Sequence, residues 1–572
     1  MPDFVAYTDK HLDVALQRLG DGVYTIVAPL AIAAWRTKEP VSFAQRTMGE
    51  PLQLSIGDAW GELFDAAWFR FTGTIPASAV GQEVVLLLDV NGELCVVDER
   101  GEPVRGLTNV ASEFDKRLGM PGKRVLPLTD RAQGREPVEV WADAGCNDLF
   151  GIVQENGVIK DAWIAVCRPD VKALYYDFEV LREAMTVLPE ASARRAQIQY
   201  ALHDAMHLIW NGLDGDAVAA ARERLRGELA KRNGDASLSV SALGHAHIDL
   251  AWLWPLRETK RKGARTFATV LANMELYPDY IFAASQAQLF QWMKEEYPGL
   301  YARIKARVAE GRIEPQGALW VEPDTNVTGG ESLIRQILYG RRYFLDEFGV
   351  DVDYVWLPDT FGYTGALPQI MARAGIRYFS TQKLSWSLIN TFPHQSFRWQ
   401  GIDGSAVLVH MLPEETYNGP AAPRSLAMIE QNYRDKGVSS HALMAYGIGD
   451  GGGGPGEEHL ERLARLRNFA GLPPVQEEWT SAFFEKWVQD ADRFATWQGE
   501  LYLERHQGTF TTNAANKWYN RRMEQVLRET EWMAAMSHRL TGADYPRAAL
   551  DAIWRELLLY QFHDILPGSS NW

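Results

Sequence analysis

Short apolar runs alternate with helical patterns through the middle of the chain. The runs LSVSAL, VDYVWL and HALMAYG are typical of buried strands. Between such runs, residues 332–348 place Leu333, Ile337 and Leu345 at the spacing of one helix face. This alternation over residues 236–495 predicts a β/α domain with a parallel sheet, either open or closed into a barrel. In both forms the reactive groups gather at the carboxyl ends of the strands.

The flanking regions follow different patterns. Residues from about 60 to 170 hold short β-rich runs such as AWFRF and VVLLL, whereas residues 171–232 are helical in pattern. The sequence therefore predicts a β-rich N-terminal domain over 1–170, a helical connector over 171–235 and the β/α domain over 236–495. A helical-bundle domain is predicted over 496–572. Because the chain stops just after an apolar helix, we expect an incomplete C-terminus and a longer parent protein.

Charge and composition narrow the classes of partner. The 572 residues carry a formal net charge of −16, and an acidic surface repels phosphate backbones, so we expect no nucleic-acid partner. No apolar run reaches the roughly 20 residues that span a bilayer, and no signal peptide is visible. We therefore expect no membrane partner and a cytoplasmic location. The three cysteines form no disulfide or zinc-ribbon pattern, so His and carboxylate would have to hold any metal.

Two segments place candidate metal ligands directly after predicted strands. His247 and Asp249 follow LSVSAL and lie two residues apart, which in an extended segment projects both side chains the same way. Imidazole plus carboxylate suits Zn²⁺, although both groups could equally be hydrogen-bonded polar residues at a strand end. Asp359 follows VDYVWL and could be a metal ligand, a nucleophile or both. The alternative for Asp359 is a helix N-cap or a turn.

A glycine-rich loop over residues 447–455 holds the third candidate. The loop contains a G-x-G-x-x-G pattern, so dinucleotide binding is one interpretation. Asp450 argues against it, because it would lie where a pyrophosphate needs positive potential. The other interpretations are a plain flexible loop and a mobile substrate loop that carries Asp450 as an acid/base. Two further patterns are weak by themselves: the pair His563 and Asp564, and the helical pair His203 and His207, which we interpret as a surface or packing face.

Taken together, the motifs resemble glycoside hydrolase family 38, the α-mannosidases, and in particular its cytosolic, vacuolar and bacterial branch. The stretches that carry the resemblance are GHAHIDLAWLWPLRET, GALWVEPDTNVTGGESLIRQ, VWLPDTFGYTGALPQI, FSTQKLSWS, GIGDGGGGP and QFHDILPGSS. They occur in the family's order from about residue 240 to the end. The resemblance implies a seven-stranded β/α-barrel and further β-rich domains beyond this chain. It also implies a zinc-dependent retaining enzyme that removes terminal α-D-mannose from oligosaccharides through a covalent glycosyl–Asp intermediate.

The resemblance also assigns roles to residues of this sequence. One zinc ion per chain would be bound by His247, Asp249, Asp359 and His563. Asp359 would also be the nucleophile, and Asp450 would be the general acid/base. The residues implied for substrate binding are Trp252 as a floor beneath the mannose, Asp564 as a hydrogen-bond partner of a sugar hydroxyl, and Lys383 and Tyr417 as lining. Two alternative functions stay open: a metal-dependent carbohydrate deacetylase and a non-catalytic carbohydrate-binding fragment. The oligomeric state is also open, with a homo-oligomer as one alternative.

Overall fold

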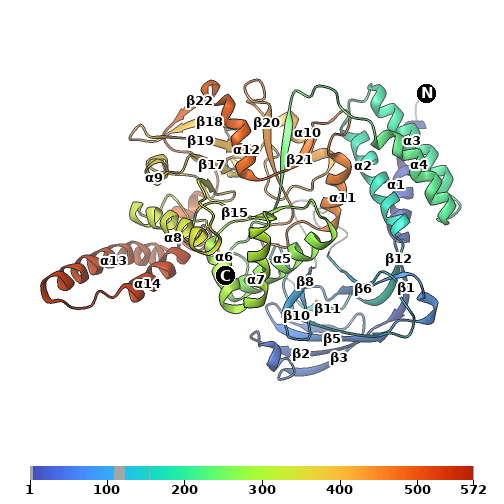
Figure 1. Ribbon diagram of the computed structural model, residues 1–572, viewed down its shortest axis with the longest axis horizontal. Coiled ribbons are helices and arrows are strands. Elements are labelled where there is room, and N and C mark those ends of the chain that lie inside the picture. The colour runs from blue at the N-terminus through green and yellow to red at the C-terminus, as the bar shows by residue number, and fades with distance from the viewer. Residues whose placement is uncertain (1–3, 109–122, 152, 154, 571–572) are drawn as a thin grey trace.

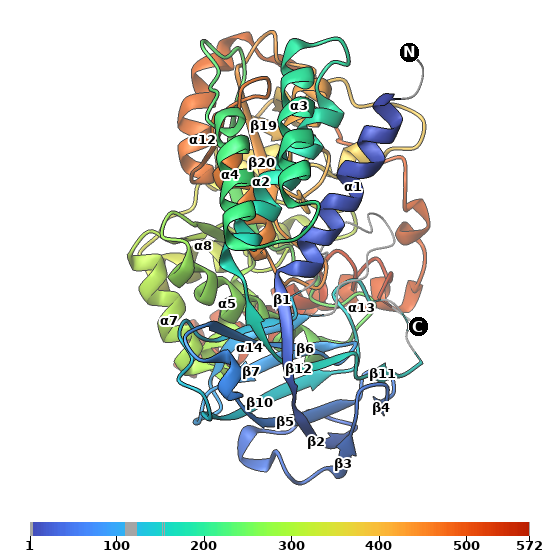
Figure 2. The same cartoon turned by 90° about the vertical axis from the view of Figure 1, so that its right-hand side faces the viewer.

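The computed structural model describes residues 4–108, 123–151, 153 and 155–570. A β-sandwich lies below a β/α part, and a helical hairpin projects from the β/α part on the side away from the N-terminus (Figure 1). Four helices from the first half of the chain lie together above the sandwich, as the turned view shows (Figure 2). None of the described helices combines the length and the apolar composition that a membrane crossing requires.

The sandwich consists of two antiparallel sheets around one apolar core. The first has the order β1 (Tyr24–Pro29), β12 (Asp161–Cys167), β6 (Glu83–Asp89), β9 (Val125–Thr129). The second has the order β3 (Glu50–Leu54), β2 (Ala31–Thr37), β5 (Ala66–Thr74), β10 (Pro137–Gly145), β7 (Glu93–Val97), β8 (Pro103–Thr108). The short strands β4 (Ala59–Gly61) and β11 (Gly157–Val158) pair separately. Alternation along β5 turns Ala67, Phe69 and Phe71 into the core between the sheets.

Four helices pack together against the β/α part. They are α1 (Phe4–Gly22), α2 (Pro169–Val187), α3 (Ala193–Ile209) and α4 (Gly215–Leu229). The region predicted as a β-rich domain over 1–170 begins with the helix α1. Its residues Leu12, Ala15 and Leu19 form a helical stripe that is buried in the same core as Val171 and Leu174 of α2.

The β/α part contains two mainly parallel sheets. One has the order β15 (Ile313–Pro315), β14 (Phe282–Ala284), β13 (Ser239–His245), β20 (His441–Tyr446), and β21 (Val475–Glu477) also pairs with β13. The other has the order β16 (Tyr354–Trp356), β17 (Tyr378–Thr381), β19 (Ala406–Met411), β18 (Ser396–Gln400), β22 (Ala495–Gln498). The covering helices are α5 (Leu256–Leu276), α6 (Ala287–Glu296), α7 (Pro298–Ala309), α8 (Gly330–Phe348), α9 (Leu367–Arg373), α10 (Pro423–Asn432), α11 (Glu457–Leu466) and α12 (Thr480–Trp487). The predicted helix over 332–348 is confirmed as α8.

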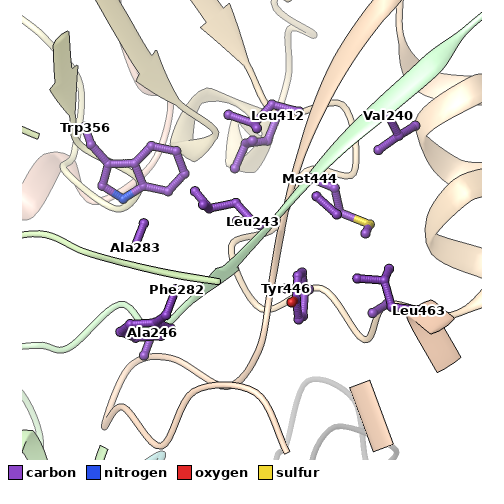
Figure 3. Close-up of a cluster of buried hydrophobic side chains, with 14 of the residues drawn as sticks. Val240, Leu243, Ala246, Phe282, Ala283, Trp356, Leu412, Met444, Tyr446 and Leu463 are labelled. Atoms are coloured by element: carbon purple, nitrogen blue, oxygen red, sulfur yellow. The ribbon is translucent and has the colours of Figure 1, made fainter. Parts of the chain in front are cut away.

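The expected closed barrel is wrong in one respect, because the hydrogen-bonded strand ladder is open at two places among the described residues. Between β15 and β16 the chain approaches closely without strand pairing, since a Cβ added to Gly317 would lie only 3.1 Å from the Cβ of Trp356. Between β19 and β20, His410 Nε2 accepts the N–H of Leu443 at 3.2 Å. A side chain thus bridges the gap between β19 and β20, and one continuous apolar core joins the two sheets. Within this core Leu243, Phe282, Trp356 and Met444, from four different strands, gather in one cluster (Figure 3).

The last two helices, α13 (Ala514–Thr541) and α14 (Arg547–Tyr560), form the projecting hairpin. Their shared apolar contact consists of Leu527, Leu550, Trp554 and Leu557. The hairpin returns the chain to the β/α part, where Phe562 forms an isolated bridge with Pro323. The residues after α14, which include His563 and Asp564, are thereby brought close to the segment that follows β15.

Buried ion pairs join the sandwich to α5. Glu93 of β7 is fully buried and lies 2.6 Å from Lys262 Nζ and 3.0 Å from Arg265 Nη1. Arg261, also on α5, pairs with Asp143 of β10, with 2.6 Å between Nη2 and Oδ1. Charges without water around them are tolerated only when they are paired, so these contacts fix how the sandwich sits on the β/α part.

We expect Glu93→Ala to lower the free energy of unfolding by about 3–5 kcal/mol, because it leaves two buried cations without their carboxylate. The matched control is Glu139→Ala on β10, whose ion pair with Arg70 is half exposed and should contribute less than about 1 kcal/mol. Urea unfolding followed by tryptophan fluorescence measures both variants. Equal losses would show that the buried network does not hold the interface.

Candidate active site and metal centre

Four of the predicted candidate residues follow the ends of three strands. His247 and Asp249 follow β13, Asp359 follows β16, and Asp450 follows β20. A fourth acidic residue, Glu322, follows β15 and was not singled out from the sequence. Because parallel strands present their carboxyl ends at a common edge, these side chains converge although they are up to 203 positions apart, from 247 to 450.

The predicted metal ligands do come together. His247, Asp249, Asp359 and His563 are all buried, and each offers a ligand atom that lies within 4.8 Å of the others. His247 Nε2 lies 2.8 Å from Asp249 Oδ1, and His563 Nε2 lies 3.4 Å from the same oxygen. His563 Nε2 is also 3.9 Å from Asp359 Oδ2. The pair His563 and Asp564, a weak pattern in the sequence by itself, therefore lies at this site.

Glu322 contacts both imidazole rings, and its backbone oxygen orients that of His563. Its Oε2 lies 3.0 Å from His247 Nδ1, and its backbone oxygen lies 2.8 Å from His563 Nδ1. The hydroxyl of Ser285 donates to Oε1 of Glu322 at 2.6 Å. Both rings therefore turn their Nε2 atoms toward the carboxylates, the arrangement that a carboxylate–histidine–metal site requires. The sequence held the signal, since Glu322 lies in the stretch GALWVEPDT after a strand, as Asp359 does in its own stretch.

The donor set fits a divalent metal. Within the described residues His563 Nε2 is buried with no well-formed hydrogen bond. Burial lowers the pKa of His247, but the carboxylates of Glu322 and Asp249 outweigh burial and raise that pKa well above its ordinary value. The cluster thus favours positive charge at the point where the Nε2 atoms and the carboxylates meet. Two imidazoles and two carboxylates are ligands that Zn²⁺ and similar borderline ions accept.

The carboxyl groups of Asp359 and Asp450 occupy contrasting surroundings. Lys383 Nζ lies 2.6 Å from Asp359 Oδ1, so an ammonium accompanies that carboxylate. Asp450 instead accepts a hydrogen bond of 2.7 Å from the Tyr417 hydroxyl. Burial, and then the charges of Asp249 and Asp359, raise the pKa of Asp450 above its ordinary range. A protonated Asp450 beside an ion-paired Asp359 is the division of roles that acid/base chemistry needs.

The site opens into a cavity of about 300 Å³. All four predicted substrate-binding residues line it, namely Trp252, Asp564, Lys383 and Tyr417. Asp249, Asp359 and Asp450 also line it, whereas His247 and His563 lie fully buried beneath. Sequence reasoning missed several further lining residues: Phe150, Phe361, Trp386, Asn418, Arg505 and His506. A pocket with aromatic walls and a few convergent polar groups suits a sugar ring.

The structure bears on two alternative interpretations of the sequence, dinucleotide binding by the glycine-rich loop and metal binding by His203 and His207. The glycine-rich loop is buried over residues 447–455 and turns Asp450 toward other carboxylates, a poor setting for a pyrophosphate. His203 and His207 approach each other at 3.2 Å between their Nε2 atoms on α3. No third candidate ligand joins them in the part of the chain that the structure describes.

Comparison with known families matches three models along the chain. Residues 237–500 match the N-terminal domain of glycosyl hydrolases family 38, residues 28–177 match an α-mannosidase jelly-roll domain, and residues 504–571 match an α-mannosidase middle domain. The chain belongs to glycoside hydrolase family 38. The candidate site draws on all three matched regions, since Phe150 comes from the first in chain order and His563 from the last.

Family relatives extend over most of this chain. Human α-mannosidase 2C1 is 39% identical over 95% of the chain and 52% of the relative, and α-mannosidase G of Dictyostelium discoideum is 35% identical over 93% and 49%. The α-mannosidase of Saccharomyces cerevisiae is 34% identical over 90% and 50%. The chain thus spans about half the length of these relatives. A crystal structure of an α-mannosidase from Enterococcus faecalis V583 shares the fold, with a TM-score of 0.52 and 21% identity over 58% of this chain and 39% of that chain.

We expect the protein to bind one divalent ion per chain. His563→Ala should lower the metal affinity by more than about tenfold, because loss of even an outer-sphere partner typically lowers it 10- to 100-fold. His203→Ala is the matched control and should leave the metal content unchanged. Elemental analysis after gel filtration, with a competing chelator, measures both. A second bound ion that disappears in His203→Ala would contradict the assignment.

Proposed function

We propose that this chain is a zinc-dependent retaining α-mannosidase that hydrolyses terminal α-D-mannose from oligosaccharides. The observation that carries the proposal is the placement of Asp359 and Asp450 in one cavity, with an ammonium beside the first and a hydroxyl on the second. Family membership supports the sugar and the bond that is cleaved. Since the chain spans about half of its relatives, activity and substrate are proposed for it.

In the proposed first step Asp359 attacks the anomeric carbon while Asp450 gives its proton to the glycosidic oxygen. The leaving sugar departs and a mannosyl ester of Asp359 remains. In the second step Asp450 takes a proton from water, and that water attacks the anomeric carbon to release mannose and the Asp359 carboxylate. The anomeric configuration is retained because two displacements occur.

The remaining residues bind, orient and balance charge. Trp252 offers an apolar ring face for the mannose, and Asp564, which accepts the Ser569 hydroxyl, can receive a hydrogen bond from the sugar. Lys383 keeps Asp359 in place for attack. A zinc ion held by His247, Asp249, Asp359 and His563 would supply Lewis acidity toward sugar hydroxyls. The borderline N/O donor set is the reason for preferring zinc.

A cytoplasmic location is part of the proposal. The cysteines Cys95, Cys146 and Cys167 are all buried as free thiols, which suits a reducing compartment. The homo-oligomer stays a prediction.

We expect the 572-residue chain to release nitrophenol from a nitrophenyl α-mannoside, to lose this activity on chelation and to regain it with Zn²⁺. Asp359→Asn should lower the rate by more than about 10⁴-fold, as loss of a nucleophile does. Nuclear magnetic resonance of the first product distinguishes retention from inversion. Release of acetate from an acetylated sugar without release of mannose would favour the deacetylase instead.

The role of Asp450 is tested by the leaving group. Asp450→Asn should slow cleavage of a mannobiose by roughly 10²- to 10⁴-fold, but should slow a dinitrophenyl mannoside far less, because that leaving group needs little protonation. The exposed Asp403→Asn serves as the control for an acidic loop residue. Equal losses on both substrates would remove Asp450 as the acid.

A further inference from the structure

Asp450 has an unusual backbone conformation in the glycine-rich loop. Its φ is +61°, in the left-handed region that residues with side chains rarely adopt. Gly449 and Gly451 flank it, and glycine offers the least backbone restraint of any residue. A strained residue of this kind persists only where its surroundings over-determine it, so the contacts around the loop decide where the carboxyl group lies.

Part of this support comes from the β/α part itself. The Asp249 N–H donates to the backbone oxygen of Asp450 at 2.7 Å, and the Gly449 N–H donates to Asn418 Oδ1 at 2.7 Å. On the far side of the loop the Gly453 N–H donates to Thr266 Oγ1 of α5 at 2.8 Å. Ile248 also forms an isolated bridge with Gly451, and the Tyr417 hydroxyl donates to Asp450 Oδ1 at 2.7 Å. The N–H of Gly451 is bonded from outside the β/α part.

The β-sandwich supplies the acceptor for this N–H. The Gly451 N–H donates to the backbone oxygen of Leu149 at 2.7 Å, and Leu149 and Phe150 pack with Ile448 in a small buried apolar cluster. Lys123 Nζ donates to the backbone oxygen of Gly454 at 2.6 Å and also to that of Gly453. A Cβ on Gly451 would collide with the Leu149 carbonyl, so this contact requires glycine.

The sandwich segment that makes these contacts is itself fixed. Lys262 Nζ of α5 donates to the backbone oxygen of Asp148 at 2.8 Å. The Phe150 N–H donates to Asp148 Oδ1 at 2.9 Å, and the Phe150 side chain is only 4% exposed. The same Phe150 side chain lines the cavity that Asp450 and Trp252 line. The segment is therefore rigid enough to transmit a position and close enough to contact a ligand.

We propose that the β-sandwich is a working part of the active site, in which Leu149 and Lys123 position Asp450 and Phe150 contacts the leaving group. The inference rests on the proposed function for its chemical content, because the acid that protonates the leaving oxygen must stand beside the leaving sugar. Phe150, next to Leu149 on the Asp450 side of the cavity, then offers an aromatic face to that sugar. Leu149 and Lys123 are positioning residues, and Phe150 determines specificity for the leaving sugar.

The positioning part is tested without any activity measurement. In Gly451→Ala the added methyl group must separate the loop from Leu149, so amide hydrogen exchange of residues 447–456 should become at least about tenfold faster. Lys123→Met should accelerate exchange in the same residues. The matched controls are Gly437→Ala, where the space around the glycine is open, and Lys160→Met, an exposed lysine of the sandwich. Exchange as slow as in the two controls would overturn the positioning role.

The specificity part is tested by comparing a mannobiose with α-mannosyl fluoride, which has no leaving sugar and needs no acid. Phe150→Ala should lower kcat/KM for the mannobiose between about 10- and 200-fold, the range for a lost apolar pocket contact, and should lower it much less for the fluoride. Trp252→Ala should affect both substrates. Equal losses in Phe150→Ala would overturn its role. If the unaltered chain cleaves neither substrate, the proposed function fails, and the exchange experiment still decides the positioning role.

Discussion

Burial of like charge is the constraint around which the site of this protein is organised. Five acidic residues, each less than a tenth exposed, gather at one edge of the strands: Asp249, Glu322, Asp359, Asp450 and Asp564. Carboxylates deprived of water are tolerated only with protons, cations or hydrogen-bond donors beside them. Lys383 supplies one cation, and His247 and His563 supply nitrogen atoms aimed at the carboxylates. The remaining demand for positive charge is what makes a divalent ion a fitting occupant.

The same constraint divides the carboxyl groups into different roles. Asp359 has an ammonium against it, whereas Asp450 has a hydroxyl donor and two neighbouring carboxylates. Burial and the neighbouring carboxylates raise the pKa of Asp450, whereas Asp359 is paired with the Lys383 ammonium, so two chemically identical side chains have different surroundings. This sorting depends on distances that the β/α part fixes, because each group follows a different strand and no local sequence feature could set their separation.

The sequence predicted the local parts of this arrangement well and the long-range parts poorly. His247, Asp249 and Asp359 were found because each follows an apolar strand, a signal contained in a few residues. His563 carried no such signal, since its ring is oriented by the backbone of Glu322, 241 residues away. Phe150 was missed because its importance lies in a contact between the sandwich and the β/α part. The opening of the strand ladder could not be predicted for a related reason: strand periodicity does not show that the His410 ring lies between β19 and β20.

Helix α5 connects the interface to the site. It begins shortly after Asp249 and Trp252, binds the Leu250 carbonyl through Thr259 at 2.6 Å, and reaches the glycine-rich loop through Thr266. Its residues Lys262 and Arg265 meet the buried Glu93 of the sandwich. Buried ion pairs contribute little net stability compared with apolar packing, but they tolerate only one relative placement of the partners. An interface that only had to hold two domains together could be apolar throughout. This interface must also place the Leu149 carbonyl within hydrogen-bond distance of Gly451. Ion pairs suit that task because a small displacement breaks them, and the charged residues of α5 form ion pairs of this kind.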